Sequence, residues 1–266
     1  MKRISSKGGN LWLVIALLLS VVVGCQTAPV TGRKQLILIS ASQEMALGAQ
    51  SYRDILKESE LSHDKQIIGM VEQVGWNIAK VTSRDYAIAK DYEWEFKVIE
   101  DDKTPNAFAL PGGKIAVYTG ILKYTQNDAG LATVMGHEVA HALARHGAER
   151  MSQILVAQIG AVALNVAIHD QDPETRRALN IAYGAGATVG VLLPFSRLEE
   201  SEADRIGLIL MAKAGYDPRE AVGFWERMAK AGGKKPPAFL STHPTDEKRI
   251  AQIKEWIPEA LAYYNP

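Results

Sequence analysis

Apolar residues recur at helical spacing along most of the chain, so the pattern predicts a mainly helical protein. Ser40 to Gln43 offer a capping box for a helix that we expect to end at about Glu58. A second helix is predicted from about Ser62, where an apolar stripe indicates one buried face: Ile67, Ile68, Val71, Val74, Ile78 and Val81. Three more helices are predicted over residues 196–214, 217–231 and 245–256, the last before a break at Pro258.

Two short strands interrupt the helical pattern. Residues 94–99 alternate as a half-buried strand does, and Lys114 to Tyr118 form a second strand after the turn signal Pro111-Gly112-Gly113. We expect the second strand to lie at a sheet edge, where an extended peptide could pair with it through backbone hydrogen bonds. Together these elements predict an α+β fold, mostly helical, with one small sheet.

Two apolar stretches, over residues 154–168 and 179–195, stand apart from the rest. Each is shorter than the roughly 20 residues of a comfortable membrane span, and polar or helix-breaking residues interrupt or bound them: Gln158, Asn165 and Pro194. We expect core or partner-facing helices here rather than membrane spans. The sequence leaves open whether they gate an active site or touch a bilayer.

Composition and charge exclude several classes of protein. The chain has 266 residues, of which 47% are hydrophobic and 23% charged, as expected for one globular core domain. Its formal net charge is zero, so the chain lacks the excess of basic residues that is typical of a nucleic-acid-binding protein. Cys25 is the single cysteine, which excludes an internal disulfide framework and a cysteine-based zinc site.

The N-terminal residues are typical of an export signal. Three basic residues precede an apolar run over residues 11–23, and the run ends in Val22-Val23-Gly24-Cys25, which resembles a bacterial lipobox. We therefore expect cleavage before Cys25 and lipidation of its thiol; the alternative is an uncleaved N-terminal anchor. Gln26 in place of Asp resembles the sorting signal for the outer membrane. The expected organisation is a signal peptide over residues 1–24, a lipidated cysteine and linker over 25–36, and one domain over 37–266.

The strongest chemical signal is His137-Glu138-Val139-Ala140-His141. In a helix, two histidines four residues apart differ by about 40° in azimuth, so both can bind one zinc ion. Glu138 is then a candidate general base for a zinc-bound water. Asn127 or Asp128 suits the N-cap of a helix, and the helical pattern then continues without a breaker until Gly147, so the motif is expected to lie inside a helix.

A catalytic zinc usually takes a third protein ligand. His146 is nine residues after His137, half a turn away on a continuing helix, so we expect it to be a surface or interhelix residue. The metzincin class is excluded as well, because Ala144 and Gly147 stand where that class needs a glycine and a third histidine.

An acidic segment near residue 200 offers a better third ligand. Glu200 and Asp204 are four residues apart, so a helix presents both on one face. Glu200 can bind zinc while Asp204 accepts the N–H of a ligating histidine. Glu199, about 100° from Glu200, is the main rival ligand, and Glu202, about 200° away, should face elsewhere.

These motifs resemble the gluzincin zinc peptidases of the HtpX and CAAX-prenyl-protease family. The resemblance covers about residues 28–256 and includes three further segments: Asn106 to Gly113, Ser196-Arg197 and Thr242-His243-Pro244. It implies a zincin-like domain whose edge strand borders the active-site helix. It also implies one Zn²⁺ per chain, held by His137, His141 and Glu200, with Glu138 as the catalytic base and Asp204 behind the ligands.

The same resemblance leaves His243 with two possible roles. It could donate a hydrogen bond to the oxyanion or occupy the fourth zinc position in a resting state, and a loop histidine bonded to backbone is the structural alternative. Arg249 could brace the site, although a plain structural role is preferred.

The lipobox makes the chain similar to the bacterial outer-membrane lipoprotein (LoiP-type) branch of that family. The chain ends without the tetratricopeptide array of the BepA type, so partner binding through such repeats is not expected. The implied activity is that of a zinc endopeptidase on misfolded or unassembled envelope proteins, bound as extended peptides along Lys114 to Tyr118 on the periplasmic face. The alternative is a zinc-stabilised chaperone or assembly factor that rarely cuts. No nucleic-acid partner is expected, and the oligomeric state is open.

Overall fold

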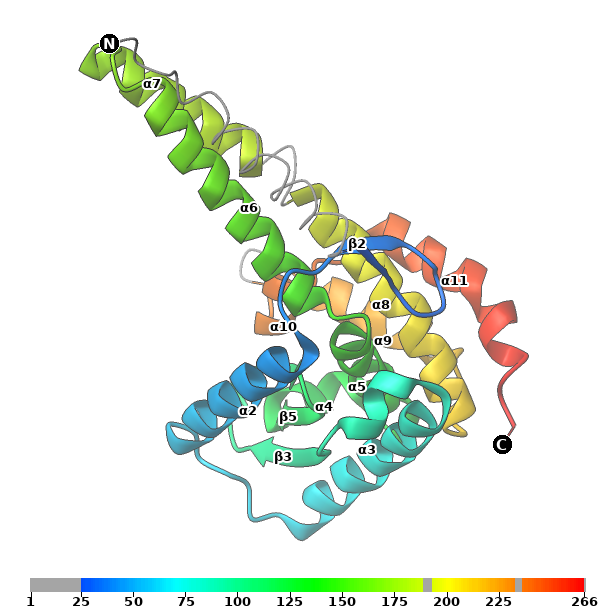
Figure 1. Cartoon of the computed structure of the whole chain (residues 1–266). Helices are drawn as coiled ribbons and strands as arrows, with labels where there is room; N and C mark the ends of the chain where they lie inside the picture. The colour runs from blue at the N-terminus through cyan, green and yellow to red at the C-terminus, as the bar shows by residue number, and fades with distance from the viewer. Residues whose placement is uncertain (1–24, 189–192, 233–235, 266) are drawn as a thin grey trace, which may run out of the picture.

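The structure, a computed structural model, describes residues 25–188, 193–232 and 236–265. The predicted signal peptide, which includes lipobox residues 22–24, lies outside the described residues, as do residues 189–192 of the second apolar stretch. Figure 1 shows a helical body with a small sheet and one long helical hairpin that projects from the body. The predicted α+β fold, mostly helical, is confirmed.

The main sheet has three strands, β3 (Glu95–Ile99), β4 (Ala107–Leu110) and β5 (Lys114–Tyr118), in the order β3-β5-β4. β5 runs parallel to β3 and antiparallel to β4. The β4–β5 turn needs Gly112 and Gly113, whose φ angles of 89° and 83° disfavour other residues. The prediction that Lys114 to Tyr118 lie at a sheet edge was therefore wrong, because this strand is central. β4 is the edge strand beside the motif helix, and its Ala-Phe-Ala-Leu sequence lacks the polar alternation that would have revealed it.

Two long helices flank this sheet. α2 (Ala41–Lys57) begins with the predicted capping box between Ser40 and Gln43, and α3 (Lys65–Asp85) is capped by Asp64. Four of the stripe residues on α3 are buried: Val71, Val74, Ile78 and Val81. A short helical turn, η1 (Ala87–Asp91), connects α3 to β3, and two more, η2 (Thr119–Ile121) and α4 (Leu122–Thr125), connect β5 to the next long helix.

The helix that carries the H-E-x-x-H motif is α5 (Asp128–Leu143), capped by Asn127 as predicted. It ends earlier than predicted. Arg145 adopts a left-handed backbone conformation with φ of 58°, and a new helix, α6 (His146–Ala167), begins at the next residue. Gly147 lies inside α6 and does not interrupt this helix. His146 therefore belongs to a different helix than His137. The half-turn offset between them, calculated for one continuous helix, does not apply.

Four helices complete the body: α8 (Leu193–Lys213), α9 (Glu220–Ala231), α10 (Ala238–Thr242) and α11 (Glu247–Leu261). The predicted break at Pro258 was wrong, because α11 continues through it. The buried core joins α3, the sheet, α5, α8 and α9.

α5 and α8 cross with their backbones in contact. A Cβ on Gly136 would lie 2.9 Å from the carbonyl oxygen of Gly207, and a Cβ on Gly207 would lie 2.9 Å from the amide nitrogen of His137. Because neither glycine has a side chain, the two helices approach closely at this point. The crossing brings the His137–His141 segment against the Glu200–Asp204 segment.

α6 pairs with α7 (Pro173–Ala187) to form the projecting hairpin of Figure 1. The structure describes every residue from 153 to 188, and Ile168 alone among them is buried. The expectation of core helices is therefore wrong for this part of the two apolar stretches. Among the described helices, α6 is the one that is long and apolar enough to cross a membrane.

We expect Gly207→Ala to lower the free energy of unfolding by about 1–3 kcal/mol, because the new methyl group would meet the backbone of α5. Gly69→Ala is the matched control. Gly69 lies in α3 with nothing within 4 Å of a Cβ placed there, so its replacement should gain up to about 1 kcal/mol of helix propensity. Urea denaturation measures both variants, and equal stabilities would contradict the close crossing.

Candidate metal centre

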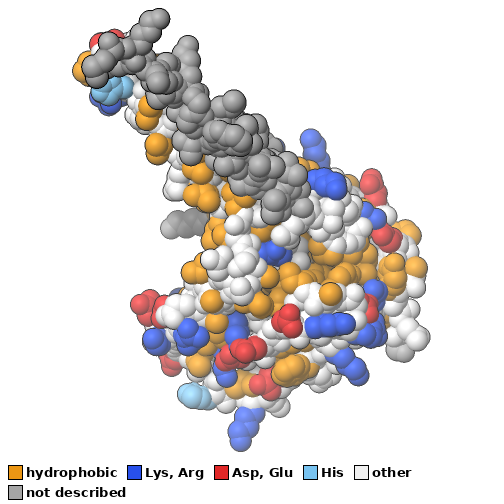
Figure 2. All heavy atoms as spheres, in the orientation of Figure 1, with side chains coloured by type: hydrophobic (Ala, Val, Ile, Leu, Met, Phe, Trp, Pro, Cys, Tyr) orange, Lys and Arg blue, Asp and Glu red, His pale blue; other side chains and the backbone are white. Residues whose placement is uncertain are grey.

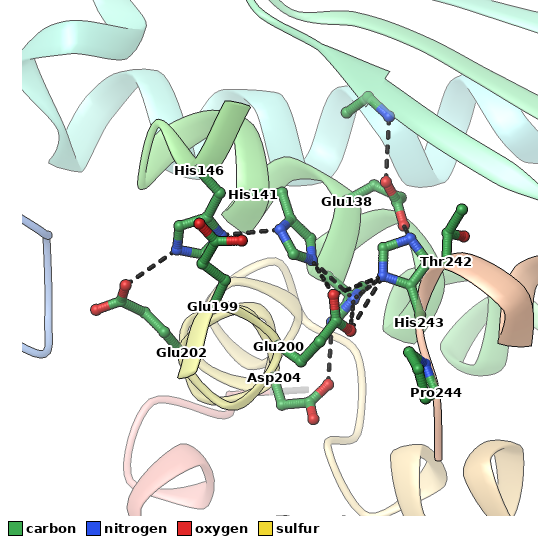
Figure 3. A network of polar contacts seen from close by, with 12 residues as sticks. Glu138, His141, His146, Glu199, Glu200, Glu202, Asp204, Thr242, His243 and Pro244 are labelled. Carbon is green, nitrogen blue, oxygen red and sulfur yellow. Dashed lines mark hydrogen bonds and ion pairs between the residues drawn. The ribbon is translucent and has the colours of Figure 1, made fainter. Parts of the chain in front are cut away.

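Four side chains that can bind a metal converge where α5 crosses α8, and Figure 3 labels three of them, His141, Glu200 and His243. His137 and His141 come from α5, Glu200 from α8, and His243 from the residue after α10. Their ligand atoms all lie within 4.8 Å of one another. The structure thus brings together the three residues predicted as zinc ligands, and it places beside them His243, for which the fourth zinc position was one of two expected roles.

The spacing of these atoms fits zinc. His137 Nε2 lies 3.1 Å from His141 Nε2 and 3.4 Å from Glu200 Oε2, and His141 Nε2 lies 3.3 Å from Glu200 Oε1. A tetrahedral zinc with bonds of about 2.0–2.2 Å separates its ligand atoms by roughly 3.3–3.6 Å. Two imidazoles and one carboxylate at this spacing are a donor set that Zn²⁺ prefers.

The protonation states of His141 and Glu200 also suit a metal. Burial would lower the pKa of His137, but Asp204 and Glu200 raise it to about 9, so His137 must lose a proton when a metal binds. Burial lowers the pKa of His141 well below its usual value, so its imidazole is neutral at pH 7, as a ligand must be. Burial would raise the pKa of Glu200, but His137, His141 and His243 hold it far below its usual range. Glu200 is therefore a carboxylate.

His243 lies at the fourth corner of the cluster. Its Nδ1 is 3.1 Å from His137 Nε2 and 3.0 Å from each carboxylate oxygen of Glu200. Its Nε2 lies 3.3 Å from Glu138 Oε1. All these contacts are to side chains of the site, so His243 is not the loop histidine of the structural alternative.

Asp204 and Arg249 support the cluster from behind. His137 Nδ1 lies 3.0 Å from Asp204 Oδ1, as the spacing on α8 predicted. Arg249 donates to both oxygens of Asp204, at 2.7 and 2.9 Å, and its Nη1 lies 3.1 Å from Glu200 Oε2. The guanidinium also stacks over Trp225 with its carbon 3.7 Å from the ring centre. Arg249 therefore braces two residues of the site, a larger role than the one preferred from the sequence.

Glu138 lies between the metal cluster and the sheet. Its Oε2 accepts a hydrogen bond of 3.2 Å from the backbone N–H of Ala109 on β4. Burial raises the pKa of Glu138, while His243 and His137 partly oppose this rise. A buried carboxylate with a raised pKa suits a general base that works near neutral pH.

The other glutamates of α8 face away from the cluster. Glu199, the rival ligand, is buried and pairs with Arg150 at 2.9 Å. Glu202 also points away from the cluster, as predicted, but it contacts a residue that supports the cluster. It is buried and accepts a hydrogen bond of 3.0 Å from His146 Nε2.

His146 connects Glu202 to the ligand His141. His146 Nδ1 lies 2.8 Å from His141 Nδ1, and the contacts appear together in Figure 3. When His141 uses Nε2 toward the metal, its Nδ1–H donates to His146, whose Nε2–H donates in turn to Glu202. Such an outer partner fixes the tautomer and the ring orientation of a ligating histidine.

This relay starts in the N-terminal segment that we predicted to be a linker. The segment forms two antiparallel strands, β1 (Cys25–Thr27) and β2 (Lys34–Leu36). Arg33 donates to Glu202 Oε2 at 2.7 Å and makes a bidentate pair with Glu149 at 2.7 and 2.9 Å. Thr31 donates to the second carboxylate oxygen of Glu202. The segment therefore helps to hold the site.

Sequence reasoning missed His146 because it assumed one continuous helix. Arg145 carried no breaker signal, since non-glycine residues rarely adopt the left-handed conformation. Arg145 is held there by contacts with distant residues: its guanidinium donates to Glu44 at 2.7 Å and to Ile39 O at 3.0 Å.

We expect His146→Phe to weaken zinc binding by about 10- to 100-fold, because the ring fills the same space but cannot accept the His141 proton. Glu199→Gln is the matched control, since this buried carboxylate touches no ligand of the cluster. Competition with a coloured chelator measures both affinities. Unchanged zinc affinity in His146→Phe would refute the positioning role.

Comparisons with known proteins agree with this geometry. The model of peptidase family M48 matches residues 69–257. The chain is 38% identical over 236 residues to the mitochondrial metalloendopeptidase OMA1 of Schizosaccharomyces pombe, a match covering 87% of this chain and 66% of that protein. It is 34% identical over 258 residues to OMA1 of Saccharomyces cerevisiae, covering 89% of this chain and 70% of that protein.

A bacterial relative is more distant. The chain is 28% identical over 237 residues to the β-barrel assembly-enhancing protease of Escherichia coli, a match that covers 86% of this chain and 46% of that protein. These relatives share the peptidase region, and the chain spans between about half and two thirds of their length. The cluster of His137, His141 and Glu200 fits the site of a gluzincin metalloendopeptidase, and the chain belongs to peptidase family M48.

Proposed function

We propose that this chain is a zinc-dependent endopeptidase. The observation that carries the proposal is Glu138, a buried base next to a cluster that fits zinc and bonded to an edge strand. When bound, Zn²⁺ supplies a Lewis acid that polarises a carbonyl and lowers the pKa of a coordinated water toward about 7. His137, His141 and Glu200 would hold it.

Glu138 would move the proton in this reaction. Its Oε1 faces the cluster, since it lies 3.3 Å from His243 Nε2, while Oε2 is fixed by the Ala109 N–H. The free carboxylate oxygen can take a proton from the attacking water and pass it to the leaving amine. Burial raises the pKa of Glu138, which makes it a stronger base for the first step.

The substrate would lie along β4 rather than along Lys114 to Tyr118. Within the described part of the chain, β4 pairs with β5 on one side, and its other side carries no strand. The N–H of Ala109 shows that the unpaired side faces the catalytic base. An extended peptide that pairs with this edge would place its backbone beside Glu138 and the cluster.

An edge strand recognises backbone rather than a particular sequence, so the substrates would be extended segments of misfolded or unassembled proteins. The names of the relatives support proteolysis, since one is a metalloendopeptidase and the other a protease. The second candidate is a zinc-stabilised chaperone or assembly factor that binds the same segments and rarely cuts. A complete ligand set together with Glu138 favours the enzyme.

His243 would keep the resting site closed. Its Nδ1 lies at the fourth corner of the cluster, where a reactive water needs to bind. The side chains of His141 and His243 are only 13% and 12% exposed, so little of the site is open to solvent in this state. A substrate would have to displace His243 before hydrolysis.

We also propose that the mature chain is a lipoprotein of the bacterial envelope, in the LoiP-type branch, anchored through Cys25 on the periplasmic face of the outer membrane. The support is the sequence Val22-Val23-Gly24-Cys25 after an apolar run, followed by Gln26. Two or more acyl chains on Cys25 would be enough for stable attachment.

We expect Glu138→Gln to abolish the hydrolysis of casein, by at least about 100-fold, because the amide cannot accept a proton. The variant should keep its zinc, since Glu138 is not one of the proposed ligands. Glu199→Gln is the control and should retain activity. Chelation should stop hydrolysis by the wild-type protein, and zinc should restore it. A zinc-replete Glu138→Gln protein that still cuts casein would refute the assignment.

We expect His243→Ala to raise the rate of casein hydrolysis, because it opens the fourth position of the cluster. If His243 instead donated a hydrogen bond to the oxyanion, the same substitution would lower kcat about 100-fold. Thr245→Ala, two residues along the same loop, is the control for general damage to the loop. The initial rates of the three proteins, at equal zinc content, separate the two roles of His243.

A further inference from the structure

The α6–α7 hairpin presents an apolar surface that the body of the protein does not cover. On α6 the exposed apolar residues cover an arc of about 200°: Met151, Ile154, Leu155, Val156, Ile159, Val162 and Val166. On α7, Leu179 and Ile181 lie on opposite sides of the helix, and the latter is 63% exposed. Figure 2 shows this apolar surface along the part of the hairpin that the grey residues leave in view.

The polar side chains between the two helices satisfy one another. Asn165 and Asn180 exchange amide hydrogen bonds of 3.3 and 3.0 Å. Tyr183 donates to the carbonyl oxygen of Ala157 at 2.9 Å, and its hydroxyl lies against Gly160. Polar groups that bond inward across small residues are typical of helix pairs in lipid, where no water is available to them.

The charges lie only at the two ends of the hairpin. Residues 151–168 of α6 and its C-terminal extension carry no charged side chain, which corresponds to about 27 Å of helix. This length is close to the roughly 30 Å of a bilayer hydrocarbon core. Charged residues then cluster at the tip, as Figure 2 shows: Asp170, Asp172, Glu174, Arg176 and Arg177.

We propose that the α6–α7 hairpin spans a lipid bilayer, with its charged tip in the far headgroup region. A second copy or a protein partner docks on one face of a helix, whereas the exposed apolar residues here cover about 200° of α6 and lie on opposite sides of α7. Charged residues at the bilayer centre would cost free energy. The uncharged length of α6 is sufficient to place the charged tip beyond the hydrocarbon core. The inference does not depend on peptide hydrolysis.

The N-terminal segment supports the same orientation. β1 and β2 lie beside the base of α6, where Arg33 pairs with Glu149 and the N–H of Leu38 donates to Ser152 at 2.9 Å. Cys25, two residues after the apolar N-terminal run, is therefore close to the end of the hairpin that joins the body. A single membrane surface could therefore contact both Cys25 and the base of the hairpin. The body of the protein, with the metal cluster, would lie on one side of that membrane.

Depth-dependent fluorescence quenching tests the proposal. Cys25→Ser removes the only cysteine of the full-length chain, and single cysteines then replace Ile159, Val166 and, as control, Leu47 on α2. Ile159 and Leu47 are 43% and 54% exposed, so their accessibility in the protein is similar. Each variant carries an environment-sensitive dye in phosphatidylcholine–phosphatidylglycerol vesicles that contain lipids with a quencher near the headgroup or near the chain end.

We expect the dye at Ile159 to be quenched at least about twofold more by the deep quencher than by the shallow one, since it lies near the middle of the uncharged run. The dye at Val166 should show the reverse order, and the dye at Leu47 should respond to neither lipid. Glu138→Gln in the same background should give the same pattern, which separates this inference from the proposed activity.

Two results would overturn the proposal. Quenching that deepens from Ile159 to Val166 would mean that the tip stops inside the bilayer. No lipid quenching at Ile159, with or without self-quenching between labelled copies, would assign the surface to a second copy or to another protein. The far-UV circular dichroism and the urea midpoint of each labelled variant, compared with those of the parent protein, show that the domain has folded.

Discussion

The backbone contact between α5 and α8 is the constraint on which the metal site depends. Gly136 and Gly207 let the two helices touch, and His137 is the next residue after Gly136. At a larger separation the two imidazoles of α5 and the Glu200 carboxylate of α8 could not share one ion. The local sequence of each helix thus supplies the chemistry, while two residues without side chains supply the geometry.

The sequence predicted those features that depend on local periodicity. Helix positions, the capping of α2 and α5, and the pairing of Glu200 with Asp204 on one face all follow from residues close in the chain. It could not predict the bend at Arg145, because distant partners hold that residue in a conformation that arginine rarely adopts. The relay through His146 was hidden for the same reason.

The strand order shows a related limit. Lys114 to Tyr118 read as a strand, but its place in the sheet depends on Ala107 to Leu110, a run too short and too uniformly apolar to be recognised. Because β4 takes the edge position, Glu138, the proposed base, is hydrogen-bonded directly to the strand that would hold a substrate. The prediction of core helices for the apolar stretches failed for a different reason, since an exposed apolar hairpin and a core helix have the same composition.

The contacts of Arg33 change where the folded unit begins. Composition alone places a boundary near residue 37, and a truncated protein would naturally be designed to start there. Such a fragment would lose the guanidinium that neutralises Glu149 and Glu202, two carboxylates that are 1% and 4% exposed. Buried charges without a partner are costly. A soluble version should therefore retain β1 and β2, and weak metal binding in a shorter one would reflect its cloning boundary rather than the native site.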